Sequence, residues 1–331
     1  MRKSFFVLAA LAVIILFIIG GLYIERTLGP GFGSAPTAAL SGDAPDFPAG
    51  DTWLNSSPLK LSDLKGKVVL VDFWTYSCIN CIRTLPFVTK WYSDYKDDGF
   101  VVVGVHTPEF AFEHDTQNVK DALARFGISY PVVQDNDYAI WNAYANEFWP
   151  AEYLLDRQGR IVGRDIGEGD YAARENVIRA QLGLQPLGTA ASSPDLSKVR
   201  SPEMYFGTDR VANLDLKETP SSAAKDYAAD LSPSLNVFSL GGQWSFAGDK
   251  ATLTGPTGEI DLKFHSAKLY FVASSTGPTT LKVTVDGRPQ PDLTVDASRL
   301  YQLFDSSEYS DHLVRIEASG AGLEAYTFTF G

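Results

Sequence analysis

The chain of 331 residues contains only two cysteines, which lie three positions apart in Cys78-Ile79-Asn80-Cys81. Two thiols at this spacing can meet the narrow geometry of a disulfide when the pair opens a helix. The unpaired N–H groups and the dipole of that helix stabilise a thiolate at the first cysteine, while the second is shielded one turn inside. We therefore expect Cys78 to attack a partner disulfide and Cys81 to resolve the mixed disulfide, which makes Cys78–Cys81 a redox-active disulfide.

Composition excludes several other functions. Two cysteines cannot staple a disulfide-rich fold, and the four histidines, at positions 106, 114, 265 and 312, are not close in sequence to the pair as zinc ligands would be. Ile82 follows Cys81, which excludes haem attachment through C-x-x-C-H. A net charge of −12 without a long basic run argues against nucleic-acid binding. We expect neither a metal nor a cofactor.

The cysteine pair lies between a predicted strand and a predicted helix. Residues 68–73 are nearly all apolar, as in a strand buried on both faces. One helical face is formed by apolar residues at positions 81, 85, 88, 92 and 95. A C-x-x-C motif in this setting is typical of a redox-active pair, whereas an isolated motif could equally be half of a metal site or an inert disulfide.

The remaining pattern predicts two domains. Strands are expected at residues 100–105 and 130–133, helices around 116–126, 136–144 and 170–183, and a hairpin joins 152–155 to 160–164. This order predicts an α/β domain over residues 46–186 with helices on both faces of the sheet. After a linker at 187–200, alternating segments at 260–264, 269–273, 281–285 and 326–330 predict an all-β sandwich over 201–331.

The first 26 residues have the pattern of a membrane anchor. Arg2 and Lys3 precede an uncharged run from 5 to 24. At a rise of about 1.5 Å per residue, this run can cross a bilayer core of about 30 Å. The leading positive charges favour a cytoplasmic N-terminus, so the domains are expected on the extracytoplasmic side, in the periplasm or cell envelope. A cleaved signal peptide is the alternative and gives the same side. Residues 27–45, rich in Gly, Pro, Ala and Ser, are predicted to be a linker.

The residues around the cysteines resemble the thioredoxin superfamily. Residues 71–75 are similar to the end of the strand that precedes the cysteines in that family, and Asp72 lies six positions before Cys78, where the family has a buried Asp. Pro150 follows Trp149 and precedes a predicted strand, as the family's cis-proline does. The resemblance covers the whole α/β domain.

This resemblance implies roles for individual residues. Asp72 would relay a proton to or from Cys81, unless nearby backbone groups simply satisfy it. Pro150 would expose backbone for pairing with a substrate strand. Glu109, at the end of the sheet that carries the cysteines, is a candidate acid or base near Cys81. Candidate substrate contacts are Trp74, Tyr76 and Trp149.

Longer stretches resemble membrane-tethered, extracytoplasmic thioredoxin-like proteins of the cytochrome c maturation type, and most specifically the extracytoplasmic region of DipZ-type proteins. The similar stretches are residues 74–81, 106–110, 167–171 and 326–331, which lie in both domains. The resemblance implies a membrane-tethered disulfide reductase that acts on protein thiols and disulfides. It would receive electrons from a separate membrane protein.

Three alternatives remain open. Thr75-Tyr76-Ser77-Cys78 is similar to the Thr-x-x-Cys of peroxiredoxins, although Val71 replaces the proline of that motif. A strongly oxidising disulfide donor would use the same two cysteines. The C-terminal domain, in turn, resembles jelly-roll carbohydrate-binding modules and could bind a glycan or a protein partner. Its candidate aromatics are Trp244, Tyr270 and Tyr301.

Overall fold

The computed structural model describes residues 42–331 except 49, 188–195 and 216. The predicted anchor at 1–26, and most of both predicted linkers, therefore lie outside the described residues. Within the described ranges, no helix combines the length and the apolar character needed to cross a membrane. Residues 41–331 form one compact unit, to which everything below refers.

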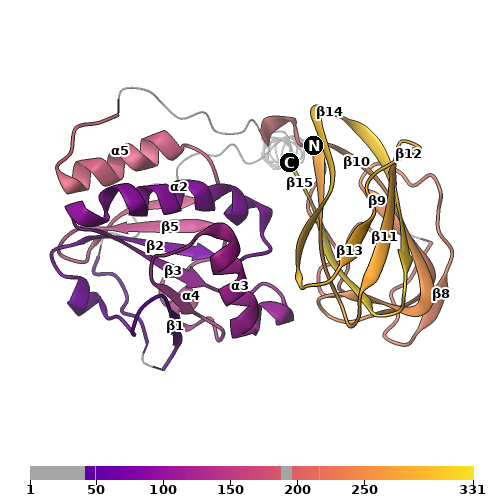
Figure 1. The fold of residues 1–331 in the computed structure, drawn as a ribbon, viewed down its shortest axis with the longest axis horizontal. Helices are drawn as coiled ribbons and strands as arrows, with labels where there is room; N and C mark the ends of the chain where they lie inside the picture. Colours follow the sequence, from indigo (N-terminus) through magenta and orange to yellow (C-terminus); the bar gives the residue numbers. More distant parts are fainter. Residues whose placement is uncertain (1–41, 49, 188–195, 216) are drawn as a thin grey trace, which may run out of the picture. The chain divides into compact units, whose positions relative to one another are not determined.

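The first half of this unit is an α/β domain built on a six-stranded sheet (Figure 1). The three central strands are parallel, and the others run antiparallel to their neighbours. In sheet order the strands are β1 (Thr52–Leu54), β4 (Val132–Gln134), β3 (Phe100–His106), β2 (Val68–Trp74), β5 (Ala151–Leu155) and β6 (Ile161–Ile166). Every residue of β2 and β5 is buried, as the apolar run at 68–73 predicts.

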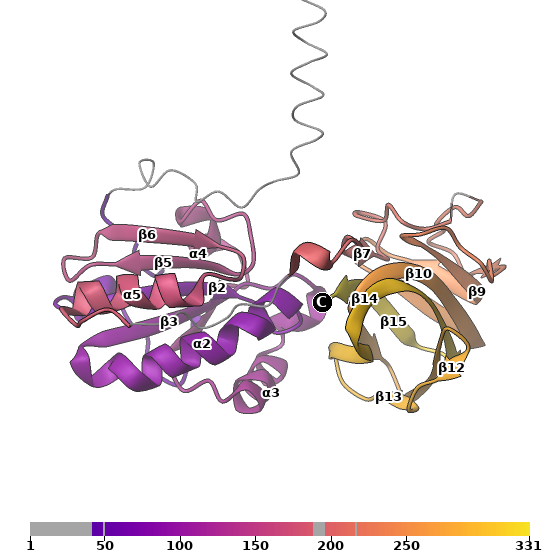
Figure 2. The same ribbon diagram turned by 90° about the horizontal axis from the view of Figure 1, so that it is seen from above.

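Helices cover both faces of this sheet. They are α2 (Ile79–Tyr95), α3 (Thr116–Phe126), α4 (Ala139–Ala143) and α5 (Tyr171–Leu182). The first two follow β2 and β3, and because the chain moves across the sheet in one direction, right-handed crossovers place both on the same face. One core cluster joins α2, α3 and α5, and Figure 2 shows α2 and α5 side by side. On the other face, Trp141 of α4 packs edge-on against Phe73.

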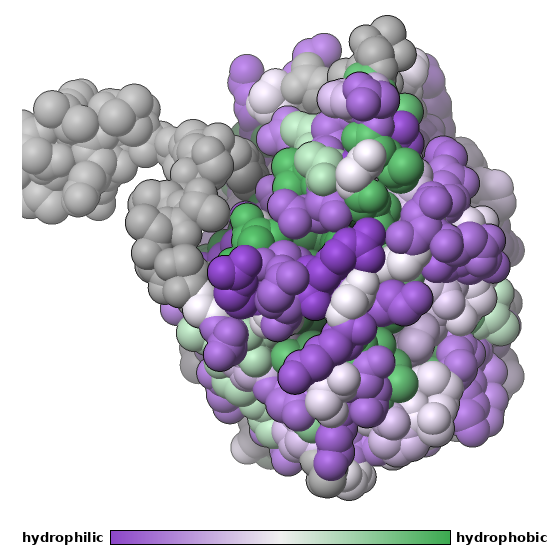
Figure 3. All heavy atoms as spheres, turned by 90° about the vertical axis from the view of Figure 1, so that its left-hand side faces the viewer, coloured by the Kyte–Doolittle hydropathy of each residue, from purple (hydrophilic) through white to green (hydrophobic). Residues whose placement is uncertain are grey.

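Local signals in the sequence fix the ends of α3. The Asp115 carboxylate accepts hydrogen bonds from the backbone N–H groups of Gln117 and Asn118, and Gly127 ends the helix at φ 66°. Short 3-10 turns complete the connections at Leu61–Leu64, Lys96–Asp98, Ala111–His114 and Leu196–Lys198. The end of the α/β domain seen in Figure 3 is mostly polar, with small apolar patches between charged side chains. Large apolar side chains are instead concentrated in the core.

The second half is a nine-stranded β region in which every strand pairing is antiparallel. Its strands are β7 (Met204–Tyr205), β8 (Lys225–Tyr227), β9 (Val237–Phe246), β10 (Ala251–Ser275), β11 (Thr279–Val285), β12 (Arg288–Pro289), β13 (Leu293–Val295), β14 (Arg299–Ser319) and β15 (Leu323–Phe330). The two strands expected at 260–264 and 269–273 are one continuous strand, β10. No turn separates them, and the irregularity between Ser266 and Lys268 is a shift in register against β14.

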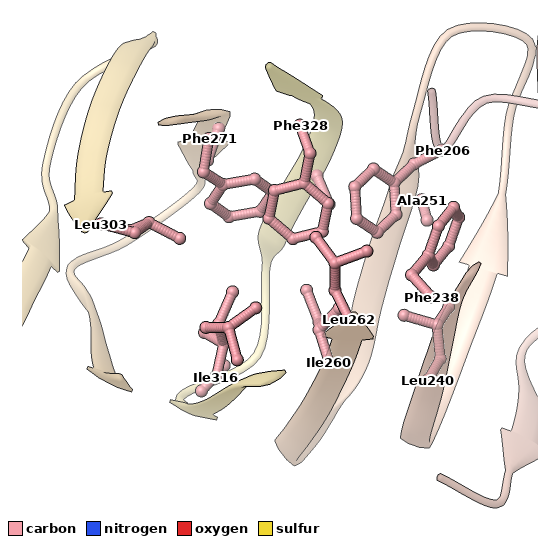
Figure 4. Close-up of a cluster of buried hydrophobic side chains, with 14 of the residues drawn as sticks. Phe206, Phe238, Leu240, Ala251, Ile260, Leu262, Phe271, Leu303, Ile316 and Phe328 are labelled. Atoms are coloured by element: carbon pink, nitrogen blue, oxygen red, sulfur yellow. The ribbon is translucent and has the colours of Figure 1, made fainter. Parts of the chain in front are cut away.

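The inner faces of these strands form a second core (Figure 4). Phe206 packs against Phe238, Phe271 and Phe328, with ring centroids 4.5 to 5.9 Å apart. The aromatic residues considered for sugar stacking are buried too: Trp244, Tyr301 and Tyr270 are 0%, 2% and 8% exposed. They are therefore not available to stack on a glycan.

Candidate functional site

The two cysteines lie at the start of α2, directly after β2. Cys78 is the N-cap residue and is half-buried, whereas Cys81 is fully buried one turn further on. Both are thiols in this structure. The first thiol is thus accessible at the positive end of a long helix, and the second is covered by protein.

Burial makes the Cys81 thiol hard to ionise. It raises the pKa of Cys81 well above its ordinary value, and a hydrogen bond with Cys78 and the charge of Asp72 raise this pKa further. A proton acceptor close to Cys81 would therefore be needed for it to react as a thiolate near neutral pH.

Asp72 lies under this thiol on β2. Its side chain is 1% exposed, and neither carboxylate oxygen has a hydrogen-bond partner among the described residues. The backbone therefore does not satisfy it, contrary to the plainer interpretation of this residue. Burial, and then the charge of Glu152, raise the pKa of Asp72 well above its ordinary value, while Arg174 acts in the opposite direction.

Glu152 and Arg174 form the next layer of the site. Glu152 on β5 is paired in register with Asp72, and its Oε1 lies 3.2 Å from Nη1 of Arg174 on α5. Both side chains are buried, at 2% and 7% exposure. Burial raises the pKa of Glu152 and Arg174 lowers it. Tyr130, whose hydroxyl is buried without a partner in the described part of the chain, belongs to the same core cluster as Cys81.

A further buried carboxylate fixes the segment before Cys78. Glu113 Oε1 accepts a 2.6 Å hydrogen bond from the Ser77 hydroxyl, and its Oε2 accepts bonds from the backbone N–H groups of Glu109 and Phe110. Burial raises the pKa of Glu113 to about 6, against the effect of the hydrogen bond from Ser77. The backbone leading into the motif is thus held by a group that titrates in a physiological range.

Arg83 is also engaged. Its Nε and Nη2 donate to Glu168 at 2.8 and 2.6 Å, and Nη2 donates to Asn80 at 2.7 Å. This side chain is only 17% exposed, so Arg83 is held in an ion pair rather than solvated at the surface. The ion pair ties the first turn of α2 to the loop before α5.

The loop before β5 contains the predicted cis-proline position. The Trp149–Pro150 bond is cis, and Pro150 is buried. The Trp149 ring is half-buried, and its centroid lies 4.2 Å from that of the Trp141 ring. The neighbouring Phe148 is 50% exposed. Trp149 and Phe148 therefore offer apolar surface next to Pro150.

Two of the predicted substrate contacts are in the core instead. Trp74 is 0% exposed and packs edge-on against His106, and Tyr76 is 1% exposed and stacks on the same ring. Because Gly104 has no side chain, the Trp74 indole can lie directly over β3, which is why it is not at the surface. Neither ring can touch a bound chain in this arrangement.

Glu109 was expected near Cys81, but its carboxylate is engaged elsewhere. Oε1 accepts hydrogen bonds from the Tyr205 hydroxyl at 3.1 Å and from Arg210 at 2.7 Å. It is the nearby Glu113 that contacts the residue before Cys78.

Sequence reasoning also missed Glu152, Arg174, Glu113 and Tyr130. A signal existed for the first two. Glu152 lies within an otherwise apolar strand segment, and Arg174 lies four residues before the buried Ile178 on one helical face. Charged residues at core-facing positions require a partner. In the described ranges, no three His, Cys, Asp or Glu side chains come together as metal ligands would.

Comparison with known proteins agrees with this geometry. Residues 40–182 match the Redoxin family, and residues 201–331 match the family described as a thioredoxin like C-terminal domain. The chain is 39% identical over 303 residues to Protein DipZ of Mycobacterium tuberculosis, which covers 88% of this chain but only 43% of DipZ. It is 31% identical over 168 residues to thiol-disulfide oxidoreductase ResA of Bacillus anthracis, which covers 50% of this chain and 92% of ResA.

One solved structure that resembles the chain is the thioredoxin domain of a thiol-disulfide oxidoreductase from Bacteroides vulgatus. The two are 30% identical, and the match covers 42% of this chain and 98% of that domain at a TM-score of 0.36.

Proposed function

Since the chain belongs to the thioredoxin-like thiol-disulfide oxidoreductases, we propose that it reduces protein disulfides through Cys78 and Cys81. The observation that carries this proposal is the contrast between the two thiols. Cys78 is accessible at the N-cap of a 17-residue helix, and Cys81 is buried over an unpartnered carboxylate.

The reaction follows from this contrast. The Cys78 thiolate attacks one sulfur of a substrate disulfide, and the other substrate sulfur leaves as a thiolate. Cys81 gives its proton to Asp72 and attacks Cys78 Sγ, which releases the second substrate thiolate and closes the Cys78–Cys81 disulfide. Two electrons pass to the substrate, and an electron donor must then return them.

Pro150 and its neighbours are proposed to bind the substrate chain. Backbone next to Pro150 would pair with an extended substrate segment, and Trp149 and Phe148 would contact its side chains. The half-buried and exposed states of these two rings support this assignment.

We further propose that the protein is tethered to a membrane by residues 1–26 and works on the extracytoplasmic side. The charge and apolar pattern of that segment support this location. The chain spans less than half the length of the DipZ proteins that it resembles. We also propose a separate membrane protein as the electron donor, and protein disulfides formed during cytochrome c maturation as substrates.

The C-terminal β region is proposed to be a jelly-roll-like sandwich that binds a protein partner. Its strands bury apolar side chains in one common core, and this supports the sandwich architecture. The three candidate aromatics Trp244, Tyr270 and Tyr301 are buried. They do not support glycan binding, and we favour a protein partner.

A redox titration tests the main proposal. The full chain in mild detergent is equilibrated in thiol redox buffers while Trp fluorescence is followed, with Cys81→Ser as the control that cannot form the disulfide. A midpoint near about −270 mV is expected for a reductase. A midpoint near about −120 mV would make the protein a disulfide donor, and no reversible transition would contradict the redox function itself.

A further inference from the structure

We propose that Glu152 is a positioning residue for proton transfer at Cys81: its negative charge, held in place by Arg174, strengthens Asp72 as the base that accepts the Cys81 proton. This inference rests on the proposed function, because it concerns the step in which Cys81 resolves the mixed disulfide. It adds the Glu152 carboxylate and the Arg174 cation to the groups that take part in that step.

The register of the sheet brings the two carboxylates together. Asp72 on β2 and Glu152 on β5 are directly opposite each other in an antiparallel pair, so both side chains project from the same face. Residues in this relation have Cβ atoms about 4.5–5.5 Å apart. Both are at most 2% exposed. Two carboxylates buried in this relation each disfavour the ionised form of the other, so the charge of Glu152 increases the proton affinity of Asp72.

The charges around the pair lead to the same conclusion. Arg174 contributes one positive charge against two buried carboxylates, at 3.2 Å from Glu152 Oε1. Its Nε also lies 3.8 Å from Asp165 on β6, but that carboxylate is 48% exposed and is partly solvated. Arg174 therefore favours the ionised form of Glu152 and leaves Asp72 as the carboxylate that can accept a proton from Cys81.

Few other titratable groups face the pair. From α2 these are the thiols of Cys81 and Cys78, and from the segment before β4 it is the hydroxyl of Tyr130, whose pKa burial raises well above its ordinary value. The β3 residue paired with Asp72 is Gly104, which has no side chain. The charge on Glu152 is thus the principal charge of the same sign that acts on Asp72.

The step balances as follows. The Cys81 S–H bond breaks and its proton moves to Asp72, while the freed electron pair on Cys81 forms the bond to Cys78 Sγ. The bond between Cys78 and the substrate sulfur breaks, and that sulfur leaves as a thiolate that is protonated by solvent. The negative charge of Glu152 makes Asp72 a stronger base than it would be alone, which favours the first transfer.

A two-phase thiol reaction isolates this step. The full chain, reduced and in mild detergent, is mixed in a stopped-flow instrument with the chromogenic disulfide dithiobis(nitrobenzoic acid) across a range of pH. Cys78 releases the first coloured thiolate, and Cys81 releases the second when it resolves the mixed disulfide. Glu152→Gln is compared with wild type and with Glu308→Gln, which makes the same charge change at an exposed position of the β region.

Glu152→Gln is expected to move the pH midpoint of the second phase down by about one unit, while the rate of the first phase stays within about twofold. Glu308→Gln should change neither phase. If Glu152→Gln leaves the midpoint of the second phase where wild type has it, the inference is wrong. A wild-type protein that never releases a second coloured thiolate would instead contradict the proposed function.

If the Glu152→Gln variant does not fold, a double variant tests the same inference. Glu152→Gln/Arg174→Gln removes both charges of the buried ion pair, which avoids leaving a buried cation alone. The effect of Glu152 on Asp72 exceeds that of Arg174, so the midpoint should again move down, by less. An unchanged or higher midpoint in this folded double variant would overturn the inference.

Discussion

His106 is expected to make the folded protein sensitive to mild acid. Its ring is fully buried at the end of β3, stacked on Tyr76 and 3.4 Å from the Thr75 hydroxyl through Nε2. Burial lowers the pKa of His106 to about 3, from an ordinary value of 6.5. Below pH 6.5 the unfolded chain therefore binds a proton that the folded protein does not.

The size of the effect follows from the two pKa values of His106. The unfolded state gains about 1.4 kcal/mol for each pH unit below 6.5, until the folded protein also binds the proton near pH 3. Between pH 7.5 and pH 5 the free energy of unfolding should fall by about 2 kcal/mol because of this residue alone. The loss should continue down to about pH 3.

Urea denaturation of wild type and His106→Gln at both pH values is the assay. Gln retains a polar group near Nε2 but cannot bind the proton. The difference in free energy of unfolding between wild type and variant should shrink by about 2 kcal/mol from pH 7.5 to pH 5. His114→Gln, at an exposed position, should show no such change. A wild-type to His106→Gln difference that stays constant within about 0.5 kcal/mol would refute the reasoning.

Three further predictions concern the neighbouring carboxylate and the second core. Between pH 4 and pH 7, wild type should lose about 2 kcal/mol of stability relative to Glu113→Gln in urea denaturation, because the folded pKa of Glu113 is raised to about 6 and its stabilising proton is lost as pH rises. Gly258→Ala should cost about 1–3 kcal/mol, since a Cβ there would lie 2.5 Å from Leu253 Cδ1, whereas Gly277→Ala, with open space, should cost much less in the same assay. Phe271→Ala should lower the free energy of unfolding by about 3–5 kcal/mol, and a loss under about 1 kcal/mol would contradict its place in the core.

The α/β framework could be predicted because each of its elements depends on a pattern that extends over only a few residues. The apolar run before the cysteines, the face of α2 and the caps of α3 each depend on neighbours within about two helical turns. The resemblance around the motif also pointed to Asp72 and Pro150. In the β region the same reasoning divided β10 into two strands, since a shift in register without a turn leaves the alternation interrupted but the strand intact.

The partners of the site residues could not be predicted in the same way. Glu152 meets Asp72 across 80 positions of sequence, and only the register of β2 and β5 puts them opposite each other. Trp74 and Tyr76 were candidate substrate contacts because they lie near the motif, yet the missing side chain of Gly104 leaves space for Trp74 in the core. Contacts of this kind depend on sheet order, which short patterns do not encode.

In the proposed mechanism, the buried carboxylates compensate for the burial of the second cysteine, Cys81. A helix that starts at Cys78 places Cys81 inside the core, where burial disfavours its thiolate. A single buried Asp beside a cation would be a weak base, because the cation favours its ionised form. Glu152 pairs with Arg174 and adds a charge of the same sign as that of Asp72. In the proposed mechanism, Asp72 therefore takes a proton from Cys81 and returns it when the disulfide is reduced again. A positive charge in direct contact with Asp72 would stabilise the folded protein but lower the pKa of Asp72. Asp72 would then be too weak a base to accept the proton of Cys81.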